Sequence, residues 1–280
     1  MAIFPSSRPL GRLAAEMRAA FVKDFRVYLR YPSLILSEFI TLPAWFVLFA
    51  VGVAASFLRK GTVTSTLGAP STFSFFYWGF IFLIVFSTSI WGIGQYIRTE
   101  QLQGTIEQLF VAPISRVSVI FGRFARTFFT DLAIIAYTVL LIGGLGHQQV
   151  SVENPPLFAL VFGILYLGVL GFGLIFAGVT FRIKSFNILS NLTQFLVIGL
   201  CGVFFPLDVL GPIKLVSFAI PFTYFADLLR YAASGSTTLI DPVLEVAVAL
   251  VLSMGLFVVG LFFFKATEKY AQTRGSIGTH

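Results

Sequence analysis

The sequence predicts an all-α integral membrane protein with six transmembrane helices, an N-terminal amphipathic interface helix, and re-entrant half-helices between spans five and six. Its 280 residues are 57% hydrophobic and only 11% charged, whereas a soluble domain carries about 25% charged residues. The mean hydropathy is +0.92, and several apolar runs approach or exceed the roughly 20 residues that a helix needs to cross a bilayer. We therefore expect an N-terminal interface segment at residues 1–33 and one multi-pass membrane domain at 34–280.

The first expected element is a basic amphipathic helix over residues 8–31. Its apolar residues recur every three or four positions, and basic residues fill the positions between them. Such a helix lies along a membrane surface, although a helix packed on a soluble partner has the same pattern. The apolar set is Leu10, Leu13, Met17, Phe21, Phe25 and Tyr28, and the basic set is Arg8, Arg12, Arg18, Lys23, Arg26 and Arg30.

The membrane spans are expected at the apolar runs that follow. Glycines near residues 92–94 and 168–173 fall inside these runs, where they are expected to allow close contact between helices or to add flexibility. The predicted spans are residues 34–58, 73–96, 127–146, 157–181, 189–205 and 243–264.

An apolar but interrupted stretch, residues 206–233, separates the fifth span from the sixth. Gly211, Pro212 and Pro221 divide it, and each half is too short to cross a bilayer. The stretch therefore predicts a pair of re-entrant or interfacial helices.

The distribution of basic residues predicts the orientation. With both termini inside, fifteen of the nineteen Lys and Arg residues lie in cytoplasmic segments, as the positive-inside rule requires. We therefore expect a protein of the cell's cytoplasmic membrane with cytoplasmic N and C termini. The net charge is +7, and the basic residues cluster beside the apolar runs. This placement favours anionic lipid headgroups over nucleic acid as the partner.

Charged residues in or near the spans are candidates for function, because a charge in hydrocarbon is costly. Most lie near a span end, where snorkelling or pairing explains them more simply than a proton relay. These residues are Glu38, Asp131, Asp227, Arg230 and Glu245.

Catalytic and metal-binding motifs are absent from the sequence. It has no GxxxxGK[ST] phosphate-binding loop, no HExxH motif and no GxSxG nucleophile elbow. The single cysteine excludes an intramolecular disulfide and a cysteine-rich metal site. We therefore expect no catalysis, no bound nucleotide and no metal in this chain.

The connection at residues 98–113, between the second and third spans, predicts a short helix outside the membrane. Its apolar stripe could dock in a groove of a soluble partner, but a passive interfacial linker fits the periodicity equally well. The stripe comprises Leu102, Ile106, Leu109 and Phe110, and the polar faces carry Glu100, Gln103, Glu107 and Gln108.

Two segments resemble the ABC-2 type transporter permeases. The stretch EQLQGTIEQLFVAPIS at residues 100–115 is similar to that family's E-x-x-x-G-T-[LI]-E-x-L-x-x-[TA]-P segment. The pieces GVFFPL at 202–207, IPFTY at 220–224 and DLLR at 227–230 are similar to its G-x-x-[FY]-P … P-x-T-Y-x-x-[DE]-x-x-R pattern. The order and spacing of these motifs extend the resemblance over nearly the whole chain.

The resemblance implies half of an ABC exporter. Two permease chains, as a homodimer or a heterodimer, would bind two ABC ATPase (nucleotide-binding) subunits, which hold ATP and Mg while this chain binds no cofactor. The coupling helix at about 98–113 would contact the ATPase, with Glu107 as the preferred contact, and the surface helix at 8–31 would contact it too. The implied ATPase contacts are Glu100, Gln103, Gly104, Thr105, Glu107, Gln108 and Pro113.

The resemblance also implies an exit gate in the re-entrant region at about 206–233, facing the dimer interface or the translocation path. Its expected residues are Gly202, Phe205, Pro206, Pro221, Tyr224, Asp227 and Arg230, with Gly211 as a further break. The chain's 34 Phe residues and its few polar span residues, such as Asn187, Asn191 and Gln194, suggest an amphipathic, lipid-linked or drug-like cargo. The competing interpretations are a secondary transporter or channel without an ATPase, and a membrane enzyme.

Overall fold

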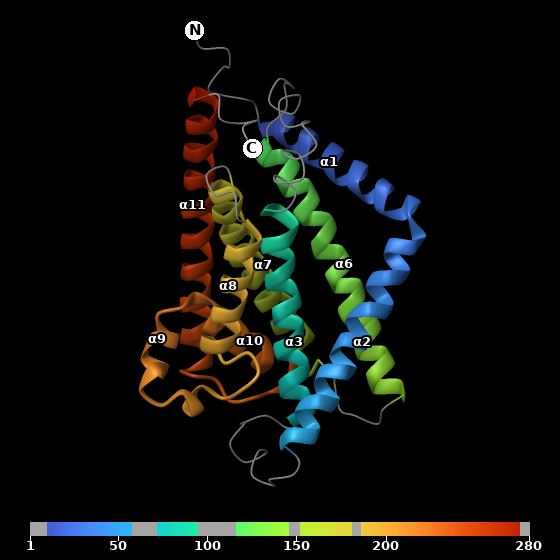
Figure 1. Ribbon diagram of the computed structural model, residues 1–280, viewed down its shortest axis with the longest axis vertical. Helices are drawn as coiled ribbons and strands as arrows, with labels where there is room; N and C mark the ends of the chain where they lie inside the picture. Colours follow the sequence, from blue (N-terminus) through green and yellow to red (C-terminus); the bar gives the residue numbers. More distant parts are fainter. Residues whose placement is uncertain (1–9, 58–71, 95–115, 146–151, 181–185, 275–280) are drawn as a thin grey trace.

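The computed structural model describes residues 10–57, 72–94, 116–145, 152–180 and 186–274. Over these residues the chain is helical and contains no strand, which confirms the predicted all-α membrane fold (Figure 1). The long helices are α1 (Leu10–Arg30), α2 (Pro32–Phe57), α3 (Thr72–Ser89), α6 (Arg116–Leu145), α7 (Pro155–Thr180) and α11 (Pro242–Arg274). The shorter ones are η2 (Ile90–Gly94), α8 (Phe186–Leu200), η3 (Leu207–Ile213), α9 (Lys214–Phe218) and α10 (Pro221–Ser234).

The centre of the bundle is formed by α3 and α7. In the span segment of each, 67% of the residues are buried inside the protein, against 17% for α11. Aromatic side chains fill this core, and Trp78, Phe82 and Phe86 of α3 are fully buried. Because α11 exposes Val251, Phe262 and other large apolar side chains, we assign its outer surface to lipid contact.

Close packing joins α7 to α11 and α10. A Cβ atom at Gly171 would lie 2.4 Å from the backbone nitrogen of Phe257 in α11, and one at Gly168 would lie 2.6 Å from the Phe225 ring of α10. Such distances leave no room for a side chain, so only glycine permits this approach. The prediction that glycines in residues 168–173 allow close helix contact is confirmed at these two positions.

The N-terminal amphipathic helix is confirmed as α1, which packs along α6. The Phe21 ring lies 5.8 Å from the Phe129 ring, centre to centre, and the Arg126 guanidinium carbon lies 4.9 Å from the centre of the Tyr28 ring. After Tyr31 the chain bends by 79° between α1 and α2. The apolar face of α1 is thus covered at least partly by α6, and its basic face is left outside.

Four described helices are long and apolar enough to cross a membrane, and a fifth candidate joins Gly11–Arg30 to Ile35–Leu48 across the bend. The 15-residue α8 is apolar but shorter than a full span. The predicted number of six spans therefore stays a prediction.

Two predicted span boundaries are corrected. The third span's helix, α6, begins at Arg116 rather than near 127, because the buried residues Ile120 and Phe124 continue its apolar stripe between the basic residues. The α-helix of the fifth span ends at Leu200 rather than 205. There Gly202 adopts a φ of 64°, a left-handed conformation that stops an α-helix.

The interrupted stretch is broken as predicted. η3, α9 and α10 replace one span, with Gly211 at a φ of 55° inside η3 and Pro221 in the first turn of α10. Figure 1 shows α9 and α10 at the end of the bundle where α11 begins. The first turn of α1 and the last turn of α11 lie at the opposite end.

Candidate functional site

The predicted ATPase-contact segment lies outside the described residues. Residues 95–115 hold all of its named positions, so their arrangement remains a prediction. These positions are Glu100, Gln103, Gly104, Thr105, Glu107, Gln108 and Pro113.

Most of the predicted gate residues meet around one cavity of about 310 Å³ next to the turn that follows α8. Gly202, Phe205 and Pro206 line it from the turn, and Asp227 and Arg230 line it from α10. Pro221 and Tyr224 do not line the cavity. They shape α10 instead, since Pro221 begins the helix and the Tyr224 hydroxyl donates a hydrogen bond of 2.9 Å to the Phe218 carbonyl.

Arg230 is the residue that ties α10 to the turn. It is 4% exposed, and its Nη2 donates hydrogen bonds of 2.7 Å and 2.5 Å to the carbonyl oxygens of Gly202 and Val203. Its guanidinium carbon lies 3.9 Å from the centre of the Phe75 ring in α3. A cation bonded to two carbonyls and stacked on an aromatic ring is stabilised without a full counter-charge, so Arg230 holds three separate segments together.

Asp227 lies one helical turn before Arg230 and lines the same cavity. Its Oδ2 accepts a hydrogen bond of 3.0 Å from the Leu239 nitrogen, which fixes the chain between α10 and α11. Glu245, a further charged span residue, is fully buried, and its Oε2 accepts a bond of 3.4 Å from the Ile240 nitrogen. These two carboxylates therefore organise the connection into α11.

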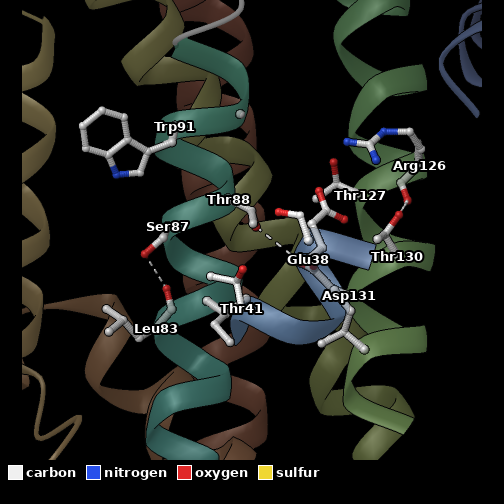
Figure 2. Close-up of a pocket in the computed structure, with 14 residues that line it drawn as sticks. Glu38, Thr41, Leu83, Ser87, Thr88, Trp91, Arg126, Thr127, Thr130 and Asp131 are labelled. Atoms are coloured by element: carbon white, nitrogen blue, oxygen red, sulfur yellow. Dashed lines mark hydrogen bonds between the residues drawn. The ribbon is translucent and has the colours of Figure 1, made fainter. Parts of the chain in front are cut away.

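A second, larger cavity of about 580 Å³ opens between α2, α3 and α6 (Figure 2). Leu83, Ile84 and Ile134 form part of its apolar wall. Figure 2 shows side chains from all three helices around one space, with α3 on one side and α6 on the other. The polar lining includes Glu38 and Thr41 from α2, Ser87 and Thr88 from α3, and Arg126 and Asp131 from α6.

The charged side chains of this cavity have partners on neighbouring helices. Asp131 is 4% exposed, and its Oδ2 accepts hydrogen bonds from the hydroxyls of Tyr166 and, at 3.4 Å, Thr88. Glu38 Oε2 accepts a hydrogen bond of 2.5 Å from the Tyr28 hydroxyl of α1. The cavity therefore places two carboxylates and the guanidinium of Arg126 within the span region.

A polar contact connects this cavity to α8. Gln194 Nε2 donates a hydrogen bond of 2.8 Å to Ser87 Oγ, and the Trp91 indole nitrogen donates one of 3.2 Å to Gln194 Oε1. Of the polar α8 residues noted in the sequence, Gln194 thus faces α3, whereas Asn187 and Asn191 are exposed.

Sequence reasoning identified Glu38 and Asp131 as costly charges but assigned them no common site. It placed Arg126 in a cytoplasmic loop, whereas the structure places it inside α6 on the cavity wall. The available signal was the presence of two charges, Arg126 and Asp131, in one apolar stretch of the chain, together with a third charge in another span.

Comparison with known proteins matches residues 15–233 to the family model described as ABC-2 type transporter. The matched range includes the charged residues that line the two cavities, and it also includes the undescribed segment at 95–115. No curated protein matches the chain in the corresponding sequence comparison.

Proposed function

The chain belongs to the ABC-2 type transporter family, and from this premise we propose that it is the permease of an exporter whose ATP is hydrolysed by a separate subunit. It is a multi-pass membrane protein and a component of a transporter. Its cargo, on this proposal, is an amphipathic, lipid-linked or drug-like molecule that leaves the cytoplasm.

The observation that carries the cargo proposal is the cavity between α2, α3 and α6. It combines apolar walls with Glu38, Arg126 and Asp131 inside the span region, and its volume of about 580 Å³ suits a small amphipathic molecule or a lipid headgroup. A charge kept within a span is costly and is retained where a polar ligand or pathway uses it.

On this proposal, the partner ABC ATPase binds ATP and Mg, and this chain binds no cofactor of its own. The coupling helix at about 98–113 transmits the closure of the ATPase, with Glu107 as its main contact. A carboxylate on a short polar helix can form a charge-assisted hydrogen bond with a basic residue of a groove. Support also comes from α1, which packs on α6. Because α6 lines the cavity, a movement of α1 caused by the ATPase would be transmitted to the cavity through α6.

A second permease chain completes the pathway, and the exposed face of α8 supports this. Asn187 and Asn191 are exposed beside Ile188 and Phe195, which are 70% and 71% exposed. Lipid cannot satisfy the hydrogen bonds of an amide. Another protein chain or a water-filled path between two chains would therefore cover this face.

The proposed location is the cytoplasmic membrane, with both termini in the cytoplasm. The described ends of α1 and α11 lie at the same end of the bundle (Figure 1), which supports placing both termini on one side. The excess of basic residues in the corresponding segments supports the cytoplasmic side.

The test is to purify the tagged full chain from its native membranes in mild detergent and to identify stoichiometric partners by mass spectrometry. A P-loop ATPase is expected with the wild type and is expected to be lost, or to be uncoupled, in Glu107→Lys. Asp208→Lys is the matched control, because Asp208 is an exposed acid whose surface pair with Lys214 contributes little. Reproducible absence of an ATPase would favour a secondary transporter or channel, which would also transport without ATP.

A further inference from the structure

Aromatic contacts hold α2 against the two other helices that line the cavity. The Phe46 ring of α2 packs on Tyr77 of α3 at 5.2 Å, and the Phe39 ring packs on Tyr137 of α6 at 5.2 Å. Ser37 and Thr41 line the cavity and are also exposed. The cavity therefore opens along α2.

The two carboxylates of the cavity retain accepting capacity. The hydrogen bonds that described residues make to Asp131 go to its Oδ2, and the one to Glu38 goes to its Oε2. Within the described part of the chain, Oδ1 of Asp131 and Oε1 of Glu38 accept no hydrogen bond and are free to accept one. A carboxylate has about four lone-pair sites, so each acid can take a further N–H donor.

Arg126 supplies the opposite charge to the same space. Its guanidinium lies over the Tyr28 ring, and it forms no ion pair with a carboxylate among the described residues. A guanidinium presents five N–H donors in a plane, an arrangement that suits the oxygens of a phosphate. The cavity thus offers acceptors and donors side by side.

The charges select among ligands. A simple cation would leave the Arg126 donors without acceptors, and an anionic lipid headgroup would bring no cationic donor for the free oxygens of the two carboxylates. A headgroup with both an ammonium and a phosphate matches both sides, and its acyl chains can lie along Leu83, Ile84 and the lipid.

We propose that this cavity binds the headgroup of a phospholipid that carries a primary ammonium and a phosphate, as phosphatidylethanolamine does. Asp131 and Glu38 accept the ammonium N–H bonds, and Arg126 donates to the phosphate. The identification of such a lipid as the transported cargo rests on the proposed exporter function. The binding site itself rests on the geometry of the cavity.

The experiment measures lipid binding to the full chain with the proteins that copurify with it, in micelles of an uncharged sugar detergent, so that no bulk phospholipid competes. A phosphatidylethanolamine with a photoreactive acyl chain is the probe, and unlabelled phosphatidylethanolamine, phosphatidylcholine and phosphatidylglycerol are the competitors. Crosslinked peptides are expected from α2, α3 and α6. Phosphatidylcholine is expected to compete poorly, because its quaternary ammonium has no N–H to donate.

Asp131→Asn and Arg126→Gln each remove one charge and are expected to weaken phosphatidylethanolamine binding about tenfold, the effect of losing one charge-assisted hydrogen bond. Asp241→Asn and Arg26→Gln remove the same charges at exposed positions and should stay within about twofold of the wild type. Ile84→Trp, which fills the cavity without changing its charge, is expected to reduce crosslinking as well.

Equal competition by phosphatidylcholine, or wild-type affinity in both charge variants, would overturn the lipid assignment. Protection of Cys201 from thiol reagents, measured on each variant, identifies those that remain folded. ATPase copurification is recorded from the same preparations. If the ATPase is present and lipid binding is unchanged in the variants, only this inference fails; if lipid binding depends on Asp131 but no ATPase is found, the exporter proposal fails and the site stands.

Discussion

Replacing Arg230 by methionine should loosen the turn that follows α8. Arg230 Nη2 bonds two carbonyl oxygens, those of Gly202 and Val203. Hydrogen bonds from a charged donor contribute about 1.5–3 kcal/mol each, and release of the buried charge offsets part of this. We expect the free energy needed to open the turn to fall by about 2–3 kcal/mol, which is about a 30- to 150-fold increase in the open population.

Cys201 reports this opening directly. It is the chain's only cysteine, it adjoins Gly202, and it is 1% exposed. Its rate of labelling by a maleimide in membranes should therefore rise in Arg230→Met by the same factor. Arg30→Met, an exposed change in α1, is the control and should leave the rate unchanged.

An Arg230→Met protein that labels at the wild-type rate, yet labels fully after unfolding in SDS, would refute this reasoning. It would mean that packing alone closes the turn and that the guanidinium bonds add nothing to it. A variant already fully labelled at the first time point would instead show a larger rearrangement than the loss of two bonds allows.

Three further substitutions test the packing. Gly171→Leu should separate α7 from α11 and lower the melting temperature of the detergent-solubilised chain, whereas Gly163→Leu on the same helix meets no atom within 4 Å and should not. Gln194→Leu removes the contact from α8 to α3 and should cost about 1 kcal/mol in thermal unfolding, the usual worth of an interhelical hydrogen bond in a membrane; an unchanged transition would contradict it. Phe46→Ala should destabilise by about 3–5 kcal/mol because it leaves a cavity between α2 and α3, and Leu48→Ala, 67% exposed, should have little effect.

The sequence alone determined the class of the protein and the places where its helices break. Composition and the length of apolar runs depend on whether water or lipid surrounds the chain. They can be read from each residue without knowing its tertiary contacts, so the membrane fold could be predicted without a structure. Gly211, Pro212 and Pro221 act through their own backbones, and the structure breaks the stretch there as predicted. Most of the motif residues at 202–230 gather around one cavity for a related reason, since they are close along the chain.

Helix boundaries and partners were harder to predict. The early end of α8 depends on the positive φ of Gly202, which Leu207 packs against, and one glycine in an apolar run does not by itself end a helix. Arg230 lies three positions after Asp227, but its guanidinium bonds carbonyls of a different segment. An arginine side chain is five or six bonds long, so it can reach groups on another segment. Spacing along the sequence does not predict which of these groups it bonds.

Only the tertiary structure decided which charges share a site. Glu38, Arg126 and Asp131 come from helices whose sequence separation is large, and each alone resembles a residue snorkelling near a span end. Their common cavity exists because α2 is held against α3 and α6 by aromatic contacts and bends by 79° from α1. Hydropathy places each helix in the membrane, but the packing of side chains between helices sets their distances, and that packing is not encoded in any one segment.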